Sequence, residues 1–76
     1  MIKRENLKDI LRSLPSNVKN RIKHTNKEYV VLELHVFSTG SYATAKLTDN
    51  FMQYRNVSNS GNCIICTETA IRLLED

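Results

Sequence analysis

Two cysteines three residues apart are the pair of side chains best suited to redox or metal chemistry in this 76-residue chain. Cys63 and Cys66 have the Cys-x-x-Cys spacing of zinc sites and of redox-active dithiols. A tetrahedral zinc site needs four ligands, and the chain has no second cysteine pair and only two distant histidines. The two isoleucines between the cysteines predict a buried strand, whereas a redox pair normally lies at an exposed helix N-terminus. We therefore expect reduced, buried, structural cysteines and neither a metal nor a cofactor. An earlier start of the final helix would favour the redox interpretation.

A histidine near a carboxylate can in principle act in acid–base catalysis. His35 shares a predicted strand face with Glu33 and Phe37. No serine elbow, paired carboxylates, glycine-rich phosphate loop or cofactor fingerprint accompanies it in the sequence. We interpret His35 as a structural or surface histidine, and His24 as a residue that favours a helix C-terminus. We expect no catalytic residue and no enzymatic activity.

Most of the basic residues lie near the N-terminus, so the two parts of the chain differ in charge. The first 27 residues carry a net charge of +6, and the remainder carries −3. Such an asymmetry directs one end of the molecule toward nucleic acid, an acidic protein or solvent. The basic residues expected to contact a partner lie on two predicted helices: Arg4, Lys8, Arg12, Lys19, Arg21 and Lys23.

Two basic helices joined at a tight corner are compatible with a helix-turn-helix that follows duplex phosphates. Three features weigh against this interpretation. The basic segment has no aromatic side chain for stacking on single strands, and a strand instead of a third helix follows it. The second helix offers only Asn17, Asn20 and Arg21 to read bases. Because Lys and Arg that flank an apolar helix face are commonly solvated, duplex DNA is the alternative partner and not the first choice.

All five aromatic residues belong to the predicted β region, which is many for a core bounded by alanines. Some of them either pair across strands or form an exposed aromatic and arginine surface of the kind that makes binding hot spots. The residues expected on that surface are Tyr42, Gln53, Tyr54 and Arg55. We interpret the chain as a non-enzymatic binding protein that regulates or inhibits a larger partner, with a protein favoured. A further alternative is a homodimer, in which an edge strand pairs with the same strand of a second copy.

The spacing of apolar residues predicts the helices that carry the basic side chains. Leucine and isoleucine residues at i, i+3, i+4 and i+7 predict a helix from about Ile2 to Ser13. Pro15 ends this helix and fits the first turn of a second one, which is capped by Ser13 or Ser16 and ends near His24 to Asn26.

Alternating apolar residues and turn signals predict the strands that follow. The expected strands are Tyr29–Phe37, Tyr42–Thr48, a weaker one over Phe51–Val57, and a short buried one over Cys63–Cys66. A final helix is expected to begin at Thr67 or Thr69. The order ααβββ(β)α predicts an α+β fold: two N-terminal helices, a three- to four-stranded mainly antiparallel sheet and one C-terminal helix, in a single domain over residues 1–76.

The length and hydropathy of the chain exclude several classes of protein. A domain of 76 residues buries only roughly 60–65% of its unfolded surface, so we expect no deep substrate cleft. No apolar run approaches the roughly 18 residues needed to span a bilayer, no signal-peptide stretch follows the N-terminus, and the basic helices lack a Trp or Phe membrane anchor. We expect a cytoplasmic protein without a membrane partner. Its size and simplicity are typical of small accessory proteins of bacteria and their phages.

Overall fold

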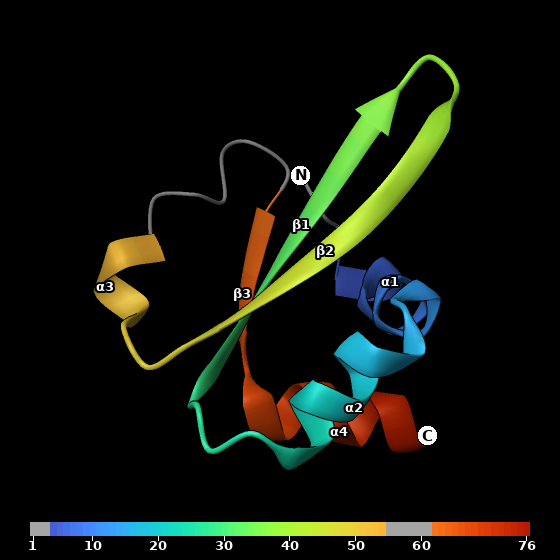
Figure 1. The fold of residues 1–76 in the computed structure, drawn as a ribbon. Coiled ribbons are helices and arrows are strands. Elements are labelled where there is room, and N and C mark those ends of the chain that lie inside the picture. Colours follow the sequence, from blue (N-terminus) through green and yellow to red (C-terminus); the bar gives the residue numbers. More distant parts are fainter. Residues whose placement is uncertain (1–3, 55–61) are drawn as a thin grey trace.

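Three helices cover one face of an antiparallel sheet in the computed structural model, which describes residues 4–54 and 62–76 (Figure 1). Two of these helices precede the sheet and one follows it. The expected α+β class is therefore confirmed. The sheet formed by the described residues has three strands, the smaller of the two expected numbers.

The two N-terminal helices form where the apolar spacing predicts them. A 3₁₀ turn at Arg4–Asn6 leads into α1 (Leu7–Ser13), and α2 spans Ser16–His24. Apolar residues repeat along one side of each helix, and those sides are buried. The buried residues are Leu7 and Leu11 of α1, its C-cap residue Leu14, and Ile22 of α2. Most of the basic side chains of the two helices lie outside this buried side: Arg12, Arg21 and Lys23 are exposed, and Lys8 and Lys19 are half-buried.

The boundary between α1 and α2 differs in detail from the prediction. Pro15 is the N-cap residue of α2, and no side chain caps this helix, so the expected capping by Ser13 or Ser16 is wrong. The Ser13 hydroxyl instead donates to the carbonyl oxygen of Ile10 at 2.7 Å. Ser13 is the last residue of α1, so its hydroxyl lies near the carbonyl one turn earlier in the same helix. It therefore bonds that carbonyl and not an N–H group at the start of α2.

The central strand of the sheet is β1 (Tyr29–Phe37), which is flanked by β2 (Gly40–Thr48) and β3 (Asn62–Cys66). Both neighbours run antiparallel to β1. β2 pairs with β1 over its whole length, whereas β3 reaches only from Tyr29 to Glu33. The β1–β2 hairpin therefore extends past β3 and away from the helices (Figure 1).

A two-residue turn closes this hairpin. Phe37 pairs with Gly40, which leaves Ser38 and Thr39 as the loop. Gly40 has a φ of 138°, a backbone conformation that residues with a Cβ rarely adopt. The positive φ of Gly40 fits this tight turn, and the turn fixes which residues of the two strands face one another.

The core lies between the helices and the face of β1 that carries Val30 and Leu32. Ala70 of α4 (Thr67–Glu75) is fully buried there. Ala43 and Ala45 of β2 pack against the same cluster. Their small side chains allow the helices to lie close to the sheet.

The chain after β2 forms a helix where a strand was expected. α3 spans Phe51–Tyr54, so the predicted strand over Phe51–Val57 is wrong for these four residues, and residues 55–57 lie outside the described part of the chain. The Thr48 hydroxyl accepts the N–H of Asn50, and the Asn50 side-chain oxygen accepts the N–H of Gln53 at 3.2 Å. These local bonds turn the chain and cap the first turn of α3, and they override the alternation of apolar residues.

Candidate functional site

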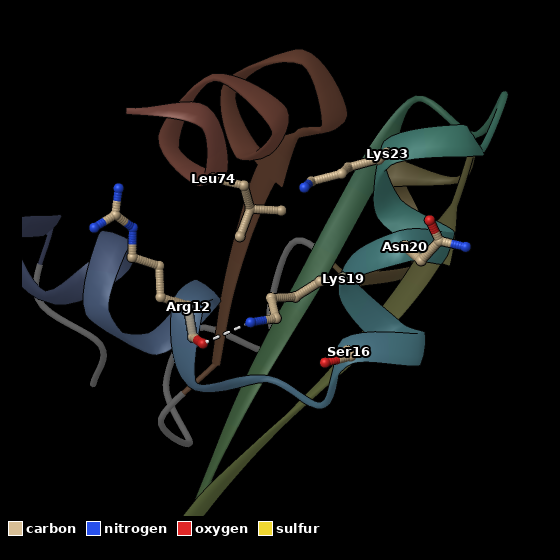
Figure 2. Close-up of a pocket in the computed structure, with 6 residues that line it drawn as sticks. All are labelled: Arg12, Ser16, Lys19, Asn20, Lys23 and Leu74. Carbon is tan, nitrogen blue, oxygen red and sulfur yellow. Dashed lines mark hydrogen bonds between the residues drawn. The ribbon is translucent and has the colours of Figure 1, made fainter.

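Three of the six basic residues predicted to contact a partner line one surface pocket between α1, α2 and α4 (Figure 2). The pocket has a volume of about 520 Å³. Its lining residues are Arg12, Ser16, Lys19, Asn20, Lys23 and Leu74. The structure therefore joins basic residues from two helices with a residue of the C-terminal helix.

The geometry of α2 directs two of the cations into this pocket. Lys19 and Lys23 are four residues apart and lie on one side of α2, from which they reach toward α1 and α4 (Figure 2). The Lys19 ammonium donates to the backbone carbonyl of Arg12 at 3.1 Å. That carbonyl belongs to the last turn of α1, so this bond satisfies a helix-end acceptor and holds the ammonium at the pocket wall.

The pocket has no carboxylate among its lining residues. The ion pairs within residues 4–54 and 62–76 are Lys27–Asp49, Lys46–Glu33 and Arg72–Glu68, at 3.2 to 3.3 Å. Arg12, Lys19 and Lys23 take part in none of them. The pocket consequently carries three positive charges that no acidic side chain in the described parts of the chain offsets by a salt bridge.

The other predicted basic residues are placed differently. Lys8 is half-buried on α1 and Arg21 is exposed on α2, and neither lines the pocket. Arg4 belongs to the 3₁₀ turn before α1. The charges of the two helices are therefore only partly gathered at one place.

Sequence reasoning did not find Ser16, Asn20 and Leu74 as parts of this site. Ser16 and Asn20 precede Lys19 and Lys23 on α2 by three residues each, a helical spacing that brings them near the same site. Leu74 comes from the other end of the chain, and no local pattern indicates that it meets α2.

A second feature is an aromatic stack at the far end of the β1–β2 hairpin. The rings of Phe37 and Tyr42 have centroids 5.7 Å apart and an interplanar angle of 14°. The His35 ring is also stacked on the Tyr42 ring, with centroids 4.8 Å apart and an interplanar angle of 18°. His35 and Tyr42 are direct partners in the strand register, so all three rings lie on the same face of the sheet.

These side chains are unusually exposed for apolar residues. Phe37 is 56% exposed and Tyr42 is 53% exposed, and Val36 on the opposite face is 72% exposed. We call His35, Val36, Phe37 and Tyr42 the hairpin surface. Because the helices cover the sheet only nearer its base, this end of the hairpin presents apolar groups to solvent on both faces (Figure 1).

Contacts with neighbouring residues of the sheet hold the His35 ring in position. Its Nε2 atom lies 3.1 Å from the Thr44 hydroxyl oxygen. The Glu33 carboxylate, which the sequence places near this histidine, forms an ion pair with Lys46 at 3.2 Å. His35 is thus held by the Thr44 hydroxyl and by stacking, while its nearest carboxylate in sequence is engaged by a lysine.

The four residues expected on one aromatic surface do not come together. Tyr42 lies near the far end of the hairpin, whereas Gln53 and Tyr54 belong to α3. Phe51 of α3 packs on Tyr29 at the opposite end of β1, with ring centroids 5.4 Å apart. His35, the partner of Tyr42 on β1, lies six residue steps from Tyr29, or about 20 Å along the strand. Arg55 lies outside the described residues.

Sequence reasoning named only Tyr42 of the hairpin surface as a binding residue. The sequence nevertheless contains a signal that His35 lies beside Tyr42. A two-residue turn at Ser38 and Thr39 places Tyr42 directly opposite His35.

The cysteines differ from the expectation in one respect. Cys63 is half-buried and packs against the core, but Cys66 is exposed, so the prediction that both are buried is wrong for Cys66. Residues i and i+3 of a strand face opposite sides, and the side carrying Cys66 is the one away from the helices. The final helix begins immediately afterwards at Thr67, the earlier of the two expected positions.

Within the described residues, no group of three or more His, Cys, Asp or Glu side chains is arranged to hold a metal ion. None of the described helices has the length and apolar composition required to cross a membrane. Comparison of the chain with protein-family models, with curated proteins and with solved structures finds no match.

Proposed function

We propose that this chain is a non-enzymatic binding protein that regulates or inhibits a protein partner, which it contacts through the hairpin surface. The observation that carries this proposal is the exposed stack of Phe37 and Tyr42. Both side chains are more than half exposed on a part of the sheet that the helices leave uncovered.

The physical support comes from the free energy of burial and from pre-organisation. Burying apolar surface contributes about 25 cal/mol per Å², and aromatic side chains are enriched among binding hot spots. The stack already restricts the rotamers of Phe37 and Tyr42 in the free protein, so less side-chain entropy is lost when a partner covers them. A small domain of this kind regulates its partner by occupying a site on it.

The test places a photo-cross-linking amino acid at Val36, which is exposed at the same end of the hairpin as the aromatic stack but on the opposite face. Irradiation in extract of the source cells should give one dominant protein adduct, because a partner that encloses this end of the hairpin covers both of its faces. Phe37→Ser and Tyr42→Ser should each remove that adduct. With the purified partner, each substitution should raise the Kd at least about tenfold, the effect expected for a hot-spot aromatic.

The control carries the same cross-linker at Arg21, which is exposed on α2 away from the hairpin. Adduct formation at Arg21 should not depend on Phe37 or Tyr42. Equal adducts at both positions, or a Kd unchanged by both substitutions, would refute the hairpin surface as the contact. A partner whose activity is the same with and without the bound chain would refute a regulatory role.

Contact with the backbone of duplex DNA is a second candidate function. The observation that favours it is the gathering of Arg12, Lys19 and Lys23 at one pocket in the strongly basic part of the chain. A duplex binder that makes 6–10 phosphate contacts loses about 10³–10⁵ in affinity between 50 and 200 mM salt. Anisotropy of a labelled duplex over this range tests the candidate, and absence of binding at the lowest salt would exclude it.

A further inference from the structure

We propose that the pocket between α1, α2 and α4 binds a phosphorylated small molecule, whose phosphate oxygens contact Arg12, Lys19 and Lys23. This site lies on the helical side of the molecule and is independent of the hairpin surface (Figures 1 and 2). It does not require the chain to bind a protein.

The charge of the pocket selects an anion. Arg12, Lys19 and Lys23 approach one cavity, and no lining residue is acidic. A guanidinium donates two parallel hydrogen bonds to phosphate oxygens, and ammonium groups add strong point charges. The bond from Lys19 to the Arg12 carbonyl uses only one of the three ammonium protons, so two remain for a ligand.

The start of α2 adds further donors to the same pocket. Ser16 is the first residue of α2 and contributes a hydroxyl group to the lining. The N–H groups of Val18 and Lys19 donate to the Pro15 carbonyl at 3.0 Å, but no side-chain cap accepts the N–H groups of Ser16 and Asn17 at the start of this nine-residue helix. These groups favour negative charge at this end of α2 and complement the three cations.

The shape of the pocket favours a small molecule over a nucleic-acid duplex. Its volume of about 520 Å³ lies within the roughly 300–1,000 Å³ typical of small-molecule sites. Leu74 supplies an apolar wall, and the Asn20 carboxamide can bond a polar group of an organic moiety. Lys8 and Arg21, which would extend a phosphate track along the helices, lie outside the pocket. Three cations around one pocket of this size therefore suit one phosphate or diphosphate group better than a long backbone.

The test is a titration of the ¹⁵N-labelled chain with ADP, followed through the amide NMR spectrum. ADP presents a diphosphate on an organic group, adenosine presents only the organic group, and inorganic pyrophosphate presents only the anion. We expect saturable shifts at Arg12, Lys19 and Lys23 with ADP, weaker binding of pyrophosphate, and no binding of adenosine. A short duplex of arbitrary sequence forms the fourth arm of the experiment.

A matched pair of charge substitutions on α2 distinguishes specific binding of the phosphate in the pocket from unspecific attraction of an anion to a basic surface. Lys23→Gln should raise the Kd for ADP about tenfold, because it removes one charged contact at the phosphate. Arg21→Gln removes the same charge from the same helix outside the pocket, and should leave the Kd within about twofold. Both residues are exposed, so neither change is expected to impair folding.

Three results would overturn the proposal. One is absence of saturable shifts with both ADP and pyrophosphate. Another is an equal loss of ADP affinity in Lys23→Gln and Arg21→Gln, which would show unspecific attraction. The third is binding of the duplex alone, which would assign the basic residues to a nucleic-acid backbone.

Discussion

At the scale of single residues, Asp49 connects the end of β2 with the segment that precedes β1. Its carboxylate accepts the backbone N–H of Glu28 at 2.8 Å and the Lys27 ammonium at 3.3 Å. The hydrogen bond from the Glu28 N–H, reinforced by Lys27, holds the pKa of the Asp49 carboxyl below its ordinary value. The ionised form of this one side chain therefore favours the folded protein.

This shift predicts how the stability depends on pH. Because the pKa of Asp49 is lower in the folded than in the unfolded chain, its contribution is present above the unfolded pKa and is lost as pH falls through the folded pKa. Asp49→Asn keeps an acceptor for Glu28 but cannot ionise. The difference in the free energy of unfolding between the two proteins should therefore shrink between about pH 6 and pH 2. Urea unfolding across this range measures it, and a constant difference would contradict the assignment.

At the scale of elements, Thr67 attaches the start of α4 to the connection between α2 and β1. Its N–H donates to the Glu28 carbonyl at 2.9 Å, and its hydroxyl donates to the Lys27 carbonyl at 2.7 Å. Thr67 is the only polar residue among those the structure describes as buried. The position of α4, and with it one wall of the basic pocket, depends on this junction.

Replacing Thr67 by valine should therefore destabilise the fold. Valine preserves the shape of the side chain but removes the hydroxyl donor, which leaves the Lys27 carbonyl without this bond and costs about 1–2 kcal/mol in the free energy of unfolding. Thr67→Ser retains the donor and is the matched control, with a smaller expected loss. The two midpoints in urea give the comparison, and a loss in Thr67→Ser at least as large as that in Thr67→Val would show that the hydrogen bond does not contribute more than the methyl group.

α3 shows how a few side-chain hydrogen bonds decide between two element types. Phe51 and Met52 are compatible with an alternating strand, but Asn50 caps a helical turn by accepting the N–H of Gln53. Placing Phe51 in this turn allows its ring to cover Tyr29 at the base of β1. The aromatic residues of the β region are consequently divided between the base and the far end of the hairpin.

At the scale of the whole molecule, the two proposed contact surfaces lie in different regions of the fold. The hairpin surface extends away from α2 and α4, which border the basic pocket (Figure 1). No residue is shared between them, and the sites rest on different elements. Effects of substitutions at separated sites without common partners are usually independent.

Independence of the two surfaces is itself testable. Phe37→Ser and Tyr42→Ser should leave the Kd for ADP within about twofold of the unmodified chain. In the reverse experiment, Lys23→Gln should leave the yield of the photo-adduct at Val36 unchanged. A change in either direction would show that the partner or the ligand reaches both regions, and would require one continuous interface.

The elements with the clearest periodicity and the distribution of charge follow from the sequence alone. The spacing of Leu7, Leu11 and Leu14 specifies a helix, and the alternation from Tyr29 to Phe37 specifies a strand, because both patterns are local and amphipathic. The basic character of the first 27 residues is likewise independent of folding. α3 was not predicted, because the apolar alternation from Phe51 onward favours a strand. The side-chain hydrogen bonds of Thr48 and Asn50 are equally local, and they favour a helical turn more strongly than the alternation favours a strand.

Which residues share a site depends on how the helices and strands pack together. Leu74 meets Arg12 and Lys23 because α4 packs beside α1 and α2, a contact between distant parts of the chain that no local pattern encodes. The stacking of Phe37 and Tyr42 depends on strand register, which the turn at Gly40 fixes only once β1 and β2 are paired. Local periodicity determines elements, whereas packing of the core and pairing of the strands determine which side chains become neighbours.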